Sequence, residues 1–169
     1  METTTKLYSL GYKDTKAYLF ASLFVAGNMA LPQLAHLVPN GGLTLLPIYF
    51  FTLIAGYKYG IRVGLLTALF SPVVNSLIFG MPVVAALPLI LIKSGLLAVG
   101  ASAAARYSKR ISLGAILVVI LGYQLMGVAC EWAISSDFYG AVQTLRWGIP
   151  GMLLQLFGGY ALLKAIAKL

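Results

Sequence analysis

Charge is scarce in this chain of 169 residues, of which only 9% are charged and 60% are hydrophobic. The mean hydropathy is +0.93. Such a composition excludes a soluble domain and predicts a membrane protein, and the short chain leaves no room for a separate catalytic domain. Only four residues are acidic against twelve that are lysine or arginine. We interpret the net charge of +8 as a signal of membrane topology, not of nucleic-acid binding.

Cysteine and histidine are almost absent. Cys130 is the only cysteine, which excludes an internal disulfide and a thiolate metal site. His36 is the only histidine and cannot build a metal site alone. The motifs G-x-x-x-x-G-K-[ST], H-E-x-x-H and G-x-S-x-G do not occur, and Glu131 with Lys93 is the one acid–base pair that could be proposed. We therefore expect a binding protein without cofactor or metal, not an enzyme.

Long apolar runs dominate what is present. Backbone groups inside a bilayer must be satisfied within the chain, which favours helices of about 20 residues. The breaks between the runs carry glycine, proline or charge. The first sixteen residues are polar, unlike a cleaved signal peptide, and are expected to form a cytoplasmic segment. The sequence thus predicts an all-α polytopic membrane domain with six transmembrane helices, at residues 17–37, 43–57, 61–79, 82–106, 112–134 and 139–167.

Basic side chains fall on one side of this predicted bundle. The loops of the other side contain only Asp137, and the two exceptions, Lys93 and Arg146, lie within or near the ends of spans. Cytoplasmic loops carry an excess of lysine and arginine, so both termini are expected in the cytoplasm, with the basic residues near anionic lipid. Ten of the twelve basic residues belong to this side: Lys6, Lys13, Lys16, Lys58, Arg62, Arg106, Lys109, Arg110, Lys164 and Lys168.

Lys93 is the charge that the sequence buries most deeply. It lies 11 residues after Pro82, which at about 1.5 Å per residue is about 16 Å, or half the hydrocarbon thickness. An ammonium group there costs about 3 kcal/mol, so it should face protein, water or an anion. We expect it to anchor a carboxylate or phosphate of a ligand. The alternatives are a buried pair with Glu131 or snorkelling toward an interface.

Further polar and aromatic side chains gather in the outward half. Asn75 either binds a ligand or joins helices by a hydrogen bond, and Glu131 and Arg146 either pair with each other or contact the ligand. Tyr123 or its neighbour Gln124 faces the pocket, and His36 has a loop or a ligand role. The two tryptophans, Trp132 and Trp147, belong either to an outer aromatic belt or to a stacking wall for a flat heterocycle. The candidate ligand-binding residues are Lys93, Asn75, Glu131, Arg146, Tyr123, Trp132, Trp147 and His36.

The stretch PNGGLTLLPIYFFTLIAGYKYGIRVGLLTALFSPVVNSLIFGMP and the sequence Ala17-Tyr-Leu-Phe-Ala21 resemble the S-components of energy-coupling factor (ECF) transporters. The first has a glycine-bearing outer loop, a GxxxG-like turn and a closing Gly-x-Pro, and the second is an AxxxA pattern. The resemblance implies that Asn40, Gly41 and Gly42 form a lid over the site, and the alternative is a simple tight turn. It also implies that Ala17 and Ala21 dock on a coupling subunit, although the same pattern is common in plain helix packing.

What the resemblance implies is the binding subunit of an importer in the bacterial inner membrane. The chain would capture a vitamin or related micronutrient at the outer face. A separate transmembrane coupling subunit and two ATPase subunits would drive release inward. The alternative from another class is a small structural or assembly membrane protein, in which the outer polar residues only hold the helices together.

Overall fold

The computed structural model describes Leu7 and residues 9–167, and in this part of the chain every regular element is helical. The all-α prediction is therefore confirmed. The predictions for residues 1–6, 8, 168 and 169, which include Lys6 and Lys168, lie outside the described residues. In chain order the elements are α1 (Thr15–Ala35), α2 (Gly41–Leu45), η1 (Pro47–Tyr49), α3 (Phe50–Tyr59), α4 (Ile61–Phe79), η2 (Val84–Ala86), α5 (Leu87–Ser108), α6 (Leu113–Ser135), α7 (Phe138–Trp147), α8 (Ile149–Leu153), η3 (Leu154–Gly158) and α9 (Gly159–Ala165).

Four helical segments of the described chain are long and apolar enough to cross a membrane. They are Thr15–Ala35, Ile61–Phe79, Val84–Ser108 and Leu113–Ser135. These correspond to the predicted spans at residues 17–37, 61–79, 82–106 and 112–134. The prediction of a membrane protein thus agrees with the length and composition of four of the six predicted spans.

The second predicted span, residues 43–57, is divided between α2, η1 and α3. The division falls at Leu46, which adopts a left-handed conformation with φ 48°, and at Pro47, which has no backbone N–H to continue a helix. The ten residues of α3 rise only about 15 Å, half of a hydrocarbon core. From Thr52 to Tyr59 every residue of α3 is buried, so α3 is the central helix of the bundle.

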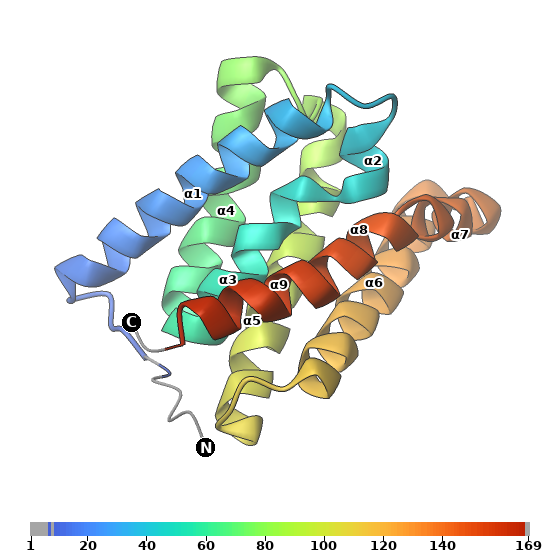
Figure 1. Cartoon of the computed structure of the whole chain (residues 1–169). Coiled ribbons are helices and arrows are strands. Elements are labelled where there is room, and N and C mark those ends of the chain that lie inside the picture. The colour runs from blue at the N-terminus through green and yellow to red at the C-terminus, as the bar shows by residue number, and fades with distance from the viewer. Residues whose placement is uncertain (1–6, 8, 168–169) are drawn as a thin grey trace.

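The last predicted span, residues 139–167, is also segmented. Helix α7 starts at an N-cap, Asp137, whose carboxylate accepts a hydrogen bond from the Gly140 N–H at 2.9 Å. Helix α8 begins with Pro150 in its first turn, and η3 is a single π-helical turn between α8 and α9. Figure 1 shows α8 and α9 running in front of α3. Neither α7 nor the run from α8 to α9 is among the four long apolar helices.

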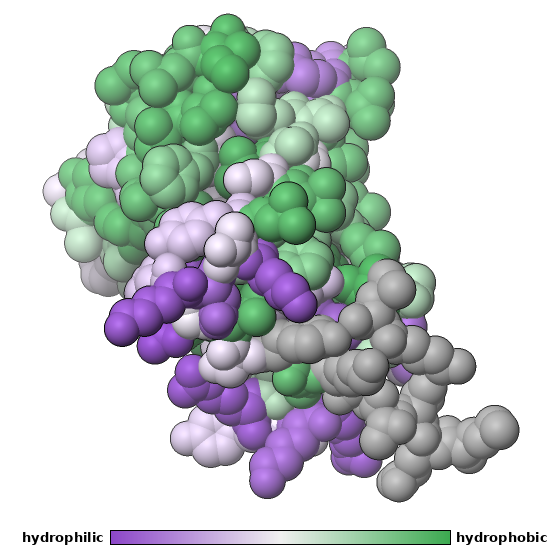
Figure 2. Space-filling view, turned by 90° about the vertical axis from the view of Figure 1, so that its left-hand side faces the viewer, coloured by the Kyte–Doolittle hydropathy of each residue, from purple (hydrophilic) through white to green (hydrophobic). Residues whose placement is uncertain are grey.

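One end of the bundle collects the basic residues. Figure 1 shows the start of α1, the turn between α3 and α4, the turn between α5 and α6 and the end of α9 along the left and lower side of the bundle. We call this the basic end, and the end that holds the α1–α2 and α6–α7 connections the opposite end. Figure 2 shows hydrophilic residues in the lower part of one face and mostly hydrophobic ones above them. The exposed basic residues at the basic end are Lys13, Lys16, Arg62, Arg106, Lys109, Arg110 and Lys164.

Lys58 differs from these exposed residues, which corrects its interpretation as a lipid-facing charge. Its side chain is fully buried, and its ammonium group donates to the carbonyls of Ile166 at 2.8 Å and Ala167 at 3.1 Å. The last carbonyls of a helix lack partners within the helix and carry partial negative charge, so a lysine there is favourable. Lys58 therefore ties α3 to the end of α9.

Small residues allow the helices to approach closely in the half near the basic end. A Cβ atom added to Gly64 would lie 2.8 Å from the Cα atom of Gly56 and 3.2 Å from the Cβ atom of Ala98. The backbones of α3, α4 and α5 therefore meet at this point. Ala17 and Ala21 have 0% and 5% exposure and belong to the same chain's core. Their methyl groups pack within the chain, which matches the alternative that the AxxxA pattern serves plain helix packing.

Candidate functional site

A buried ion pair joins α5 to α6 near the opposite end. The Nζ atom of Lys93 lies 2.8 Å from the Oε2 atom of Glu131, and the two side chains are 7% and 16% exposed. The aliphatic part of Lys93 runs along Gly127, where an added Cβ atom would come within 2.6 Å of the lysine Cε atom. Gly127 and Glu131 are four residues apart and so share a face of α6. The arrangement is the buried pair that the sequence left as an alternative to an anion anchor.

The pair lies nearer the opposite end than the sequence predicts. Lys93 comes six residues after the start of α5 at Leu87, which corresponds to about 9 Å along the helix axis. Glu131 comes four residues before the end of α6 at Ser135, which corresponds to about 6 Å. The prediction counted helical rise from Pro82, whereas residues 80–83 form no helix and η2 precedes α5.

Thr144 connects the ion pair to α7. Its hydroxyl donates to Oε1 of Glu131, the oxygen that Lys93 does not use, at 2.9 Å. The same hydroxyl lies 3.1 Å from the carbonyl oxygen of Gly140, one turn earlier in α7. Both carboxylate oxygens of Glu131 therefore have partners within the protein.

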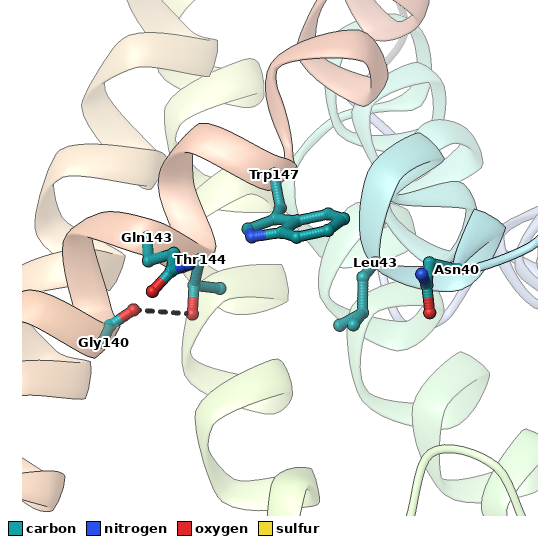
Figure 3. Close-up of a pocket in the computed structure, with 6 residues that line it drawn as sticks. All are labelled: Asn40, Leu43, Gly140, Gln143, Thr144 and Trp147. Atoms are coloured by element: carbon teal, nitrogen blue, oxygen red, sulfur yellow. Dashed lines mark hydrogen bonds between the residues drawn. The ribbon is translucent and has the colours of Figure 1, made fainter.

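A cleft of about 320 Å³ opens on the other side of Thr144, between α7 and α2. Figure 3 shows the Trp147 indole reaching from α7 toward Leu43 and Asn40 of the α2 region, with Gln143 and Thr144 beside it. The contributions of α7 are spaced i, i+3, i+4 and i+7, which places them on one face of the helix. The lining residues are Asn40, Leu43, Gly140, Gln143, Thr144 and Trp147.

The α2 side of the cleft is shaped by a tight turn after α1. Asn40 has φ 57°, a left-handed conformation that asparagine tolerates better than most residues. A Cβ atom on Gly41 would collide with the carbonyl oxygen of Ala35, so only glycine fits there. A Cβ atom on Gly42 would lie 3.0 Å from the His36 ring, which places His36 against the back of this turn. Of the predicted lid, Asn40 lines the cleft, and Gly41 and Gly42 support the turn.

Three of the predicted binding residues and one residue of the predicted lid are near the cleft. Trp147 lines it together with Asn40, and Lys93 and Glu131 are connected to it through Thr144. Neither Trp132 nor Arg146 is among the lining residues. Trp132 packs edge-on against Phe138 with ring centroids 5.4 Å apart. Arg146 is exposed and has no ion pair with a described residue, because Glu131 pairs with Lys93 instead.

Asn75 belongs to a buried network that joins α1, α3 and α4. Its amide group donates to the carbonyl oxygens of Asn28 at 2.9 Å and Ser71 at 3.0 Å. The Asn28 amide group in turn donates to the hydroxyls of Thr52 and Ser71. Asn75 is 1% exposed, and its Oδ1 atom has no hydrogen-bond partner in the described structure. The geometry matches the alternative in which Asn75 joins helices.

Tyr123 lies in a second buried network, which is closer to the basic end than the ion pair. Its hydroxyl donates to Oε1 of Gln155 at 3.0 Å and accepts from the Gln124 amide at 3.1 Å. The ring of Tyr49 packs against the ring of Tyr123 with centroids 5.6 Å apart. Gln155 belongs to the π-helical turn η3, so this network joins α6 to the segmented last stretch. Tyr123 does not line the cleft.

Sequence reasoning missed Leu43, Gly140, Gln143 and Thr144 as candidate residues. The spacing of Gly140, Gln143, Thr144 and Trp147 on one helical face was a signal that could have identified three of them. Leu43 had no such signal, because its position depends on the turn that brings α2 against α7. No group of three or more His, Cys, Asp or Glu side chains that could hold a metal ion occurs in the described part of the chain.

Comparison with known proteins gives no assignment for this cleft. No protein family model matches the chain, and neither a curated protein nor a solved structure is significantly similar to it. The chemistry of the cleft is therefore inferred from its side chains, which offer an aromatic surface and neutral hydrogen-bonding groups. Such a site suits reversible binding of a small molecule.

Proposed function

We propose that the chain is the substrate-binding subunit of an energy-coupling factor importer and captures a vitamin or related micronutrient. The observation that carries the proposal is the cleft between α2 and α7, at the opposite end from the basic residues and one hydrogen bond from a buried ion pair. An ionisable pair among helices that cross a membrane is costly and is commonly associated with function. The sequence resemblance supplies the class of importer.

The direction of the cleft follows from the basic end. By the positive-inside rule this end faces the cytoplasm, with both termini inside, and the cleft opens toward the outside of a bacterial inner membrane. The exposed lysines and arginines of the basic end would contact anionic lipid headgroups. A transmembrane coupling subunit and two ATPase subunits would supply the energy. Because Ala17 and Ala21 are buried, the coupling subunit would contact other residues of the chain.

Ligand binding is tested by thermal unfolding of the purified protein in detergent with a panel of vitamins and their precursors. A ligand that binds only the folded state raises the melting temperature by mass action. We expect one compound to stabilise the wild type. Trp147→Ala should weaken its affinity by at least tenfold, since the indole is the largest side chain that lines the cleft.

Trp132→Ala is the matched comparison, because Trp132 is similarly exposed and at the same end but lies outside the cleft. It should keep wild-type affinity. Equal losses of ligand affinity in the two variants would show that both tryptophans act only as membrane-interface anchors and that Trp147 has no specific contact with the ligand. A panel without any stabilising compound would contradict the binding function.

Membrane orientation is tested by labelling single cysteines with a membrane-impermeant maleimide in intact cells. In a Cys130→Ala background, Tyr139→Cys at the start of α7 should react from outside, because the cleft end faces out. Tyr107→Cys at the end of α5 should react only after the cells are permeabilised. The two tyrosines are comparably exposed, at 78% and 90%. The reverse pattern would contradict the proposed direction of the cleft.

A structural or assembly function is the second candidate, and one observation favours it. Several buried polar side chains already join helices through partners within the chain, namely Lys93, Glu131, Asn28 and Asn75. A scaffold of this kind would carry no small molecule and would not be stabilised by any compound of the panel. The thermal experiment therefore distinguishes the two functions.

A further inference from the structure

The side chains that line the cleft are uncharged. Asn40 and Gln143 each carry a primary amide, which both donates and accepts hydrogen bonds. Neither side-chain amide has a hydrogen bond to another described residue in the structure, so both are available to a ligand. Trp147 and Leu43 provide the apolar surface, and the indole face suits stacking of a flat ring.

The nearest charges do not alter this neutral character. The ammonium group of Lys93 and the carboxylate of Glu131 lie 2.8 Å apart and compensate each other. Asp137 is occupied as the N-cap of α7, where it accepts from the Gly140 N–H. Arg146 lies on α7 but is not among the lining residues. An anionic ligand would therefore find no cation among the residues that line the cleft, and the loss of its hydration there would be unfavourable.

Thr144 adds a directional requirement. A hydroxyl has one proton, and in Thr144 that proton is directed to protein acceptors, either Glu131 at 2.9 Å or the Gly140 carbonyl at 3.1 Å. The oxygen of Thr144 keeps its capacity to accept a hydrogen bond, and Thr144 lines the cleft. A ligand edge that faces it must therefore donate, as an N–H group does.

The size of the cleft limits the ligand. A volume of about 320 Å³ is at the lower end of small-molecule sites. One or two fused rings fit this space, whereas a large conjugate would extend beyond it.

Given the proposed binding function, on which this inference rests, we infer that the ligand is an uncharged, planar nitrogen heterocycle with an amide or lactam edge. The indole of Trp147 stacks on the ring. Thr144 accepts a hydrogen bond from an N–H group at the amide or lactam edge of the ligand. The side-chain amides of Asn40 and Gln143 form hydrogen bonds with the remaining donors and acceptors of that edge. This class differs from the carboxylate or phosphate that Lys93 alone suggests.

Two matched pairs of probes test the class with the full-length protein in detergent. Nicotinamide and nicotinate share a ring and differ in an amide against a carboxylate, and uracil and orotate share a lactam ring and differ in a carboxylate. We expect the neutral member of at least one pair to raise the melting temperature and to bind at least tenfold more tightly than its carboxylate. Gln143→Leu should reduce that discrimination at least tenfold, and Gln33→Leu, at an exposed position of α1 outside the cleft, should retain it.

The outcomes separate this inference from the proposed function. A carboxylate that binds as tightly as its neutral partner, or more tightly, overturns the neutral class and leaves ligand binding intact. Failure of both neutral probes at millimolar concentration also rejects the class, while the vitamin panel decides independently whether the protein binds any small molecule. Equal discrimination in wild type and Gln143→Leu would reject the role of the cleft in selecting the ligand.

Discussion

Lys93→Ala is expected to destabilise the folded protein by about 3–5 kcal/mol, because it leaves the carboxylate of Glu131 mostly buried without its counter-charge. Removing one partner of a buried pair costs more than the pair contributes, since the remaining charge has lost its hydration. The measurement is the unfolding midpoint of the purified variant in detergent. If Lys93 instead served only as an anchor for a ligand anion, the variant would fold normally and lose only binding.

A second variant distinguishes loss of the pair from loss of side-chain packing. Lys93→Met combined with Glu131→Leu removes both charges and keeps much of the apolar volume, so it should recover most of the stability that Lys93→Ala loses. Lys16→Ala, at an exposed position of α1, is the control and should change stability by less than about 0.5 kcal/mol. A double variant as unstable as Lys93→Ala would contradict the electrostatic explanation.

Gly64→Ala is expected to destabilise the bundle by about 3 kcal/mol, the upper end of the range for overpacking. The new methyl group would lie 2.8 Å from the Cα atom of Gly56, where backbone and not a flexible side chain must move. Gly64 of α4 contacts both Gly56 of α3 and Ala98 of α5 at this point. A shift of α4 away from them would therefore loosen the packing of all three helices. The shift in melting temperature relative to the wild type measures the effect.

Gly122→Ala is the matched control for this substitution. Gly122 also lies within a helix, α6, but an added Cβ atom there has nothing within 4 Å. This variant should be neutral or more stable by about 0.5–1 kcal/mol, since alanine loses less conformational freedom than glycine in a helix. Similar destabilisation by both substitutions would contradict the close approach of α3, α4 and α5.

The long helices could be predicted from the sequence because their apolar runs are nearly uninterrupted. The bounds of α4 agree with the predicted stretch, and α1, α5 and α6 differ only at their ends. The segmented stretches could not be predicted in the same way. Leu46 gives no sequence signal for a left-handed conformation. The π turn at Leu154–Gly158 carries Gln155, whose hydrogen-bond partner Tyr123 lies in α6, 32 residues away in the sequence.

The candidate site was predicted in part, since Asn40 and Trp147 line the cleft and Lys93 and Glu131 lie behind it. Which partner Lys93 takes could not be decided from the sequence, because a lysine in an apolar run pairs equally well with a ligand or a carboxylate. Gly127, four residues before Glu131, was the available signal, since it leaves room for the lysine side chain. Lys58 was misinterpreted because its position at a helix end is the same as that of an exposed topology residue.

Native mass spectrometry of the protein released from detergent tests most directly whether the cleft between α2 and α7 holds a small molecule. We predict that the wild type and Trp132→Ala carry one bound compound per chain, that the compound is uncharged at neutral pH, and that Trp147→Ala has lost it. Wild-type protein that carries no compound after growth in rich medium, or Trp147→Ala that retains it fully, would contradict binding in this cleft.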